Sequence, residues 1–157
     1  MIFDLVVDTN VFLHSTDTRQ QLCAPAKQFL AKLLAGATFL CIDEGFDMDE
    51  SKNRSVIGSE YFDKLRFVDA AFAIITALGG KGRILKLPKA VDPRAGKKIR
   101  QLVRNKTDRT FLKVSYNSQC RTFVSHDFED LPAAKRVVIA REIGVASVNA
   151  VEACNLV

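Results

Sequence analysis

The sequence predicts a single three-layer α/β/α domain with a mainly parallel central sheet. Short segments rich in β-branched and aromatic residues alternate with longer segments of helical character. Strands separated by helices need crossover connections, which produce parallel strands covered on both faces. The chain has 157 residues, of which 48% are hydrophobic, so one domain spanning residues 1–157 can bury a sufficient core.

The N-terminal part supplies two strands and the helix between them. Residues 2–7 are apolar and predict the first strand, and residues 25–34 predict a helix that Gly36 ends. Residues 38–42 predict a short buried strand. The next segment, DEGFDMDESKNRS at residues 43–55, is polar and acidic without a period, which is typical of a loop. This segment is called the acidic loop below, and we expect its charges to be solvated.

The middle of the chain is mostly helical. Residues 56–78 predict one long helix or a broken pair, apolar on most sides and ended by two glycines. RILKL at residues 83–87 indicates a strand, although the proline and lysines beside it weaken the pattern. Residues 94–104 and 107–116 predict two further helices.

The C-terminal part continues the alternation with a strand at residues 121–125, a helix at 132–143 and a last strand at 145–148. The longest apolar run, residues 70–78, is half the length of a membrane span, and the N-terminus lacks the basic start and cleavage site of a signal peptide. The four cysteines are far apart and form no CxxC or Cys/His pair. We therefore expect free thiols, a cytoplasmic location and no membrane partner.

Positive charge is concentrated in one stretch. Residues 81–109 hold eleven basic residues and two acidic ones, a net charge of +9, so the rest of the chain carries −4 of the total +5. Within this stretch Ala95, Ile99, Leu102 and Val103 recur at helical spacing. The opposite side of that helix, called the basic face below, consists of Lys97, Arg100 and Arg104. A solvated helix surface is one interpretation; the segregation of charge favours a polyanionic partner.

Three aspartates are predicted to meet at one edge of the sheet. In LVVDTNVFLHS, residues 5–15, Asp8 ends the first strand, and in TFVSHDFEDLP Asp127 follows another strand. Asp108 lies in the first turn of the helix before that strand. Since open α/β sheets carry their functional crevice at the carboxyl ends of the strands, the three acids should converge there.

Each acid also has a structural interpretation. Asp8 and Asp127 could be turn residues, and Asp108 could oppose the helix dipole after a Thr107 N-cap. Asp130 precedes Leu131 and Pro132, which favours an N-cap, so we leave it out of the site. Taken together on one edge, the other three acids favour a functional site.

Two segments resemble the PIN domain family of metal-dependent nucleases: VVDTNVFL near the N-terminus and, later in the chain, TDRTFLKVSYNSQCRTFVSHDFEDL. The later segment follows that family's run of an aspartate, a phenylalanine three residues on, an amphipathic helix, a strand, then Ser or Thr and another aspartate. The resemblance implies a parallel sheet with helices on both sides, and acids that hold Mg²⁺ or Mn²⁺ and cut RNA or, in some branches, DNA. Its catalytic and metal-binding acids would be Asp8, Asp108 and Asp127, assisted through hydrogen bonds by Asn10 and Ser125.

The family also has an acid at the start of the helix after the second strand. Glu60, in VIGSEYFDKL, begins the first strongly helical segment, and PIN branches with a longer insert carry an E-Y pair there. We therefore prefer Glu60 as the fourth catalytic and metal-binding acid. Three acids of the acidic loop stay open as alternatives: Asp47, Asp49 and Glu50.

A carboxylate cluster beside a phosphodiester makes sense only with a hard divalent cation, which prefers oxygen ligands. We thus expect an Mg²⁺- or Mn²⁺-dependent endonuclease, most consistent with an endoribonuclease that binds RNA through the basic face and Arg109. The resemblance leaves two protein partners open, an antitoxin and a second copy in a homodimer. The histidines, His14 and His126, are not assigned to the site.

Two other functional classes are considered. One is a nucleic-acid-binding module that keeps the fold without cleavage, which the four acids argue against. The other is an α/β phosphohydrolase acting on a small molecule with Asp8 as nucleophile. Such enzymes usually have a second aspartate two residues later, where this chain has Asn10.

Overall fold

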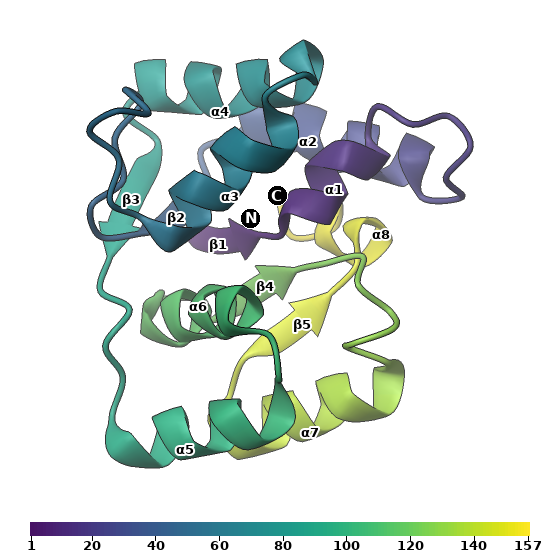
Figure 1. Cartoon of the computed structure of the whole chain (residues 1–157). Helices are drawn as coiled ribbons and strands as arrows, with labels where there is room; N and C mark the ends of the chain where they lie inside the picture. Colours follow the sequence, from purple (N-terminus) through teal and green to yellow (C-terminus); the bar gives the residue numbers. More distant parts are fainter.

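The computed structural model describes residues 1–157, which form a five-stranded parallel sheet with helices on both sides (Figure 1). The strand order is β3-β2-β1-β4-β5, and every pairing is parallel. The strands are β1 (Asp4–Val7), β2 (Phe39–Asp43), β3 (Ile84–Leu87), β4 (Thr122–Val124) and β5 (Ala146–Val148). The predicted fold class is confirmed.

Eight helices connect and follow the strands. They are α1 (Thr9–His14), α2 (Cys23–Ala35), α3 (Val56–Leu65), α4 (Asp69–Gly80), α5 (Pro93–Leu102), α6 (Lys106–Asn117), α7 (Ala133–Ile143) and α8 (Ala150–Ala153). In Figure 1 α3 and α4 lie toward the top of the view and α5 and α7 at its bottom, with the sheet and α6 between them. None of the helices combines the length and apolar composition needed to span a bilayer, and all four cysteines are free.

The central strand β1 is buried along its whole length. Its register pairs Asp4 with Phe39 of β2 and Val7 with Val124 of β4. Because both faces of a parallel sheet are covered by helices, the run of Leu and Val suits this place. The carboxyl ends of β1 and β4 therefore lie side by side, which brings together the residues that follow them.

A chain of aromatic contacts links the helices at this edge. The rings of Phe12 and Tyr61 are 5.4 Å apart, those of Tyr61 and Phe111 6.3 Å, and those of Phe111 and Phe123 5.8 Å. All four side chains are buried. These contacts join α1, α3, α6 and β4, which are the elements that carry the predicted site residues or precede them.

The helical segment predicted at residues 56–78 is a broken pair. Helix α3 ends at Leu65 and α4 begins at Asp69, with Phe67 between them 91% exposed. The short helix α8 was not predicted, although the sequence contains its signal. Asn149 and Glu152 form a capping box in which each side chain accepts a hydrogen bond from the other residue's backbone N–H.

Part of the basic stretch serves the fold itself. Arg83 is 8% exposed, and its guanidinium donates to the carbonyl oxygens of Leu33, Leu34 and Thr38. Lys81 also donates to the carbonyl of Leu34 at 2.9 Å. Both side chains thus satisfy carbonyl groups at the C-terminal end of α2, where positive charge is favourable. Arg83 therefore does not belong to a free binding surface, whereas Lys81 is exposed but already has a protein partner.

Candidate functional site

Asp8 lies directly after β1 and is 7% exposed. Its backbone N–H continues the sheet pairing by donating to the carbonyl of Val124 at 2.8 Å. Its Oδ2 accepts hydrogen bonds from Asn10 Nδ2 at 2.9 Å and Ser125 Oγ at 2.7 Å. Burial raises the pKa of Asp8 to about 6 despite the Ser125 hydrogen bond, and nearby negative charges add to the effect.

Asn10 and Ser125 connect Asp8 to the segment after β4. Asn10 Oδ1 accepts from the backbone N–H of His126 at 3.0 Å, and Ser125 Oγ accepts from the backbone N–H of Asp127 at 3.0 Å. Each side chain therefore donates to Asp8 and accepts from the neighbouring segment. Both predicted supporting residues lie where they orient the carboxylate.

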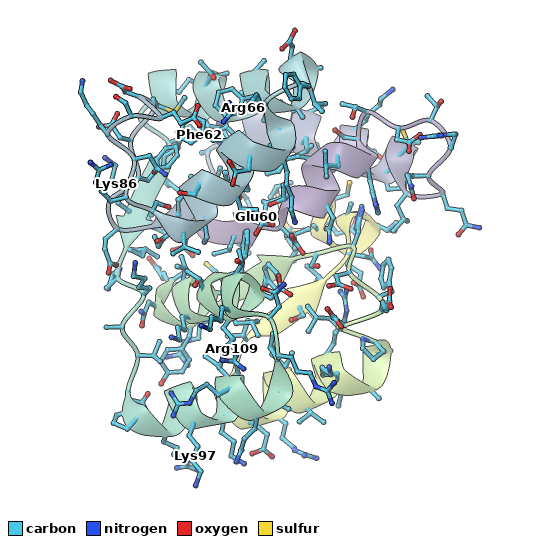
Figure 2. The ribbon with its side chains drawn as sticks, viewed as in Figure 1. Glu60, Phe62, Arg66, Lys86, Lys97 and Arg109 are labelled. Carbon is cyan, nitrogen blue, oxygen red and sulfur yellow. The ribbon has the colours of Figure 1, made fainter.

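Glu60 reaches the same edge from α3, between α3 and α6 (Figure 2). Its side chain is 11% exposed, and Oε1 accepts from Thr9 Oγ1 at 2.9 Å and from Lys64 Nζ at 3.0 Å. The Tyr61 hydroxyl donates to the carbonyl of Val7, which ties α3 to the end of β1. The charge of Glu60 raises the pKa of both Asp8 and Asp108. The structure thus brings Glu60 to the other acids.

The first residue of the acidic loop, Asp43, contradicts the prediction. Asp43 was expected to be solvated, which is wrong: it is fully buried. Its carboxylate accepts hydrogen bonds from Ser55 Oγ and from the backbone N–H groups of Val56 (2.8 Å) and Ile57 (2.9 Å). A carboxylate at the positive end of a helix is favourable, so Asp43 fixes the start of α3.

The remaining candidates in the acidic loop satisfy local partners. Asp47 accepts from the backbone of Asp49 at 2.8 Å, and Asp49 pairs with Lys52 at 3.0 Å. Glu50 pairs with Arg66 at 2.6 Å. By contrast, the acids that raise the pKa of Asp108 are Asp8, Glu60, Asp127 and Asp130.

Asp108 lies in the first turn of α6, as predicted, but the helix begins one residue earlier than expected. The N-cap is Asn105, not Thr107, because Asn105 Oδ1 accepts from the backbone N–H groups of Thr107 and Asp108. The carboxylate of Asp108 forms no hydrogen bond and no ion pair. Burial and the surrounding carboxylates raise the pKa of Asp108 to about 7.

Asp130 belongs to this cluster, contrary to the prediction of an N-cap. Helix α7 begins at Ala133 with Pro132 at the N-cap, so Asp130 lies too early to cap it. Carboxylate oxygens of Asp108, Asp127 and Asp130 all lie within 4.8 Å of one another. The backbone N–H of Asp130 donates to Asp127 Oδ1 at 2.9 Å. Residues 127–130, DFED, therefore form a turn, and a turn at this place in the sequence would have predicted that Asp130 lies beside Asp127.

Arg136 was also missed by the sequence analysis. From α7, its Nη2 donates to the carbonyl oxygens of Ser125 (3.0 Å) and Asp127 (3.2 Å), and its Nε donates to that of Leu131 at 2.7 Å. No motif marks an arginine one helical turn into a surface helix. Arg136 thereby holds the loop that presents Asp127 and Asp130.

The two histidines, His14 and His126, connect α1 to the segment after β4 and to the start of α8. His126 Nε2 accepts from the backbone N–H of Ala150 at 3.2 Å, so the ring proton lies on Nδ1 and is donated to His14 Nδ1 at 3.0 Å. Burial lowers the pKa of His126 to about 4. The pair is therefore neutral near pH 7 and joins α1 to the start of α8.

The fold and the site define an α/β/α domain with a carboxylate cluster at the carboxyl edge of its parallel sheet. Asp108, Asp127 and Asp130 form a compact group there. Asp8 and Glu60 lie outside this group, although their charges raise the pKa of Asp108. Comparison of the sequence with protein-family models and with curated proteins finds no match.

Proposed function

We propose that this protein is an Mg²⁺- or Mn²⁺-dependent nuclease, with RNA as the favoured substrate. The main observation in support is that Asp8, Glu60, Asp108 and Asp127 lie at one edge of the sheet. Their negative charges add to burial in raising the pKa values of Asp8 and Asp108. Carboxylates held together at this cost favour a hard cation with oxygen ligands. The resemblance of two segments to the PIN domain family supports the same function.

The donor set fits such a cation. The Asp108 carboxylate has no partner in the protein, so its oxygen atoms remain for ligation. When bound, the cation supplies charge neutralisation for the scissile phosphate and lowers the pKa of an attacking water. Asn10 and Ser125 keep Asp8 oriented, and Arg136 keeps the loop of Asp127 in place. No side chain needs to act as a nucleophile.

The substrate class is supported by exposed positive charge. All residues of the basic face are exposed, but the predicted helix ends early: Lys97 and Arg100 lie on α5, and Arg104 follows its end. Arg109 is half-buried and donates through Nε to the carbonyl of Val103 at 2.6 Å, which leaves its terminal nitrogens without a protein partner. In Figure 2 Arg109 lies between Glu60 and Lys97. A polyanion contacting the basic face would thus pass Arg109 on its way to the acids.

The test is Asp8→Asn, which removes charge and preserves an oxygen acceptor for Asn10 and Ser125. Mn²⁺-dependent cleavage of single-stranded RNA should fall by more than about 100-fold, as expected for loss of a metal ligand. Asp69→Asn is the matched control, because Asp69 is an exposed acid at the start of α4 without a side-chain hydrogen bond or ion pair. Full cleavage by a folded Asp8→Asn protein would refute the mechanism. RNA binding without cleavage by the wild type would favour the non-catalytic module.

A further inference from the structure

Lys64 places a positive charge beside Glu60, at the border of the acidic site. It lies one turn after Glu60 on α3, and its Nζ is the only cationic group that forms an ion pair with one of the four proposed ligands. Burial alone would lower the pKa of Lys64, but the hydrogen bond to Glu60 and the charges of Glu60, Asp8 and Asp108 raise it. The ammonium group therefore contacts Glu60 directly, and the charges of Asp8 and Asp108 act on it without a contact.

The contact at Glu60 leaves that oxygen saturated. Glu60 Oε1 already accepts from Thr9 Oγ1 at 2.9 Å and from Lys64 Nζ at 3.0 Å. A carboxylate oxygen accepts about two hydrogen bonds, so a metal ion that binds through Oε1, alone or together with the free Oε2, must displace Lys64. Thr9 is fully buried and cannot withdraw, whereas the Lys64 side chain is 56% exposed on a flexible stem.

The displaced ammonium would remain close to the reaction. Lys64 lines a polar hollow of about 370 Å³ together with two acids, Glu60 and Asp63, and with Arg54, Ser59 and Thr107. The hollow adjoins the acidic site through Glu60, and Thr107 precedes Asp108. It therefore offers a released ammonium group space beside the phosphate that the acids would bind.

We propose that Lys64 takes the place of the metal ion at Glu60 in the metal-free protein and binds the substrate phosphate once the metal displaces it. This inference rests on the proposed nuclease function. It assigns two opposite effects to one side chain: Lys64 weakens metal binding and strengthens substrate binding.

The experiment compares Lys64→Met, Lys64→Arg and the wild type. By titration calorimetry, Lys64→Met should bind Mn²⁺ roughly threefold to tenfold more tightly, since a competing charge is removed. At saturating Mn²⁺, its kcat/KM for single-stranded RNA should nevertheless fall about tenfold or more, because the variant cannot form a charged hydrogen bond to phosphate. Lys64→Arg should stay within a few-fold of the wild type in both measurements. Lys52→Met is the control, because Lys52 forms a similar ion pair with Asp49 in the acidic loop.

The outcomes separate the two proposals. Unchanged Mn²⁺ affinity in Lys64→Met would overturn the displacement, and tighter Mn²⁺ binding with unchanged cleavage would overturn the phosphate contact. Both results leave the nuclease function standing. A wild-type protein that binds no Mn²⁺ would overturn the nuclease function and the role of Lys64 together.

Discussion

Replacing Asp108 with asparagine should stabilise the metal-free protein. The carboxylate has no hydrogen bond to lose, and its pKa rises from 3.8 to about 7 under burial and the charges of the other acids. A difference of this size would correspond to about 4 kcal/mol in the free energy of unfolding. Because Asp108 is partly exposed, solvent screening should reduce the gain to about 1–2 kcal/mol. For a chain of this length, that gain raises Tm by about 2–8 °C.

The pH dependence of this gain has a defined sign. Below pH 3.8 the carboxyl group of Asp108 is protonated in both the folded and the unfolded protein, so wild type and variant should be equally stable. As pH rises toward about 7, the unfolded chain ionises while the folded protein keeps its proton, and the wild type loses stability. The advantage of Asp108→Asn should therefore grow from pH 4 to 7 and stay constant above.

Urea unfolding at pH 5 and pH 8, with and without Mn²⁺, measures the effect. Millimolar Mn²⁺ should raise the stability of the wild type at pH 8, because an ion that binds only the folded state stabilises it, and this rise should be absent in Asp108→Asn. Asp69→Asn controls for the removal of an acid elsewhere. A metal-free Asp108→Asn protein that is less stable than the wild type at pH 8 would refute the unfavourable ionisation of Asp108 in the folded protein.

Three further changes test other parts of the site. Glu60→Gln should abolish metal-dependent cleavage while the combined amide replacement of Asp47, Asp49 and Glu50 costs little; the reverse pattern would move the fourth ligand to the acidic loop. Replacing all residues of the basic face with Gln should make RNA binding less sensitive to salt, as measured by fluorescence anisotropy. The slope of log affinity against log salt concentration should become shallower by roughly 0.7 for each phosphate that the variant no longer binds. An unchanged slope would mean that the basic face only meets solvent. Asp43→Asn should lower the free energy of unfolding by about 1–3 kcal/mol in urea, because its charge-assisted bonds hold the start of α3; a neutral effect would contradict that role.

The sequence predicted the fold and the edge where the acids meet because strands and helices have regular periods. Apolar runs such as Leu5–Val7 and the punctuation by Gly36 depend on local geometry, and local geometry is readable along the chain. The alternation of strands and helices then places Asp8 and Asp127 at the carboxyl edge without knowledge of any contact.

The errors concern side chains whose role depends on distant partners. Asp43 and Asp49 are both loop acids in the sequence, but only Asp43 meets the free N–H groups of α3. Asp130 was assigned to α7 because the start of a helix is predicted less well than its existence. Arg136 contacts carbonyl oxygens that carry no sequence signal. Tertiary partners of this kind cannot be read from spacing alone.

The aromatic contacts in the core help to explain why Asp8 and Asp108, whose pKa values are raised first by burial and then by the nearby acids, bind protons. Three of the acids lie on or beside helices that insert an aromatic ring into the core within four residues: Phe12 after Asp8, Tyr61 after Glu60 and Phe111 after Asp108. A close-packed interior resists displacement, so the helices cannot separate to spread the charges apart. Proton uptake near pH 6–7 by Asp8 and Asp108 is then the relief that remains in the metal-free protein. Because the packed core holds the acids in place, a cation bound at this edge of the sheet would stabilise the folded protein.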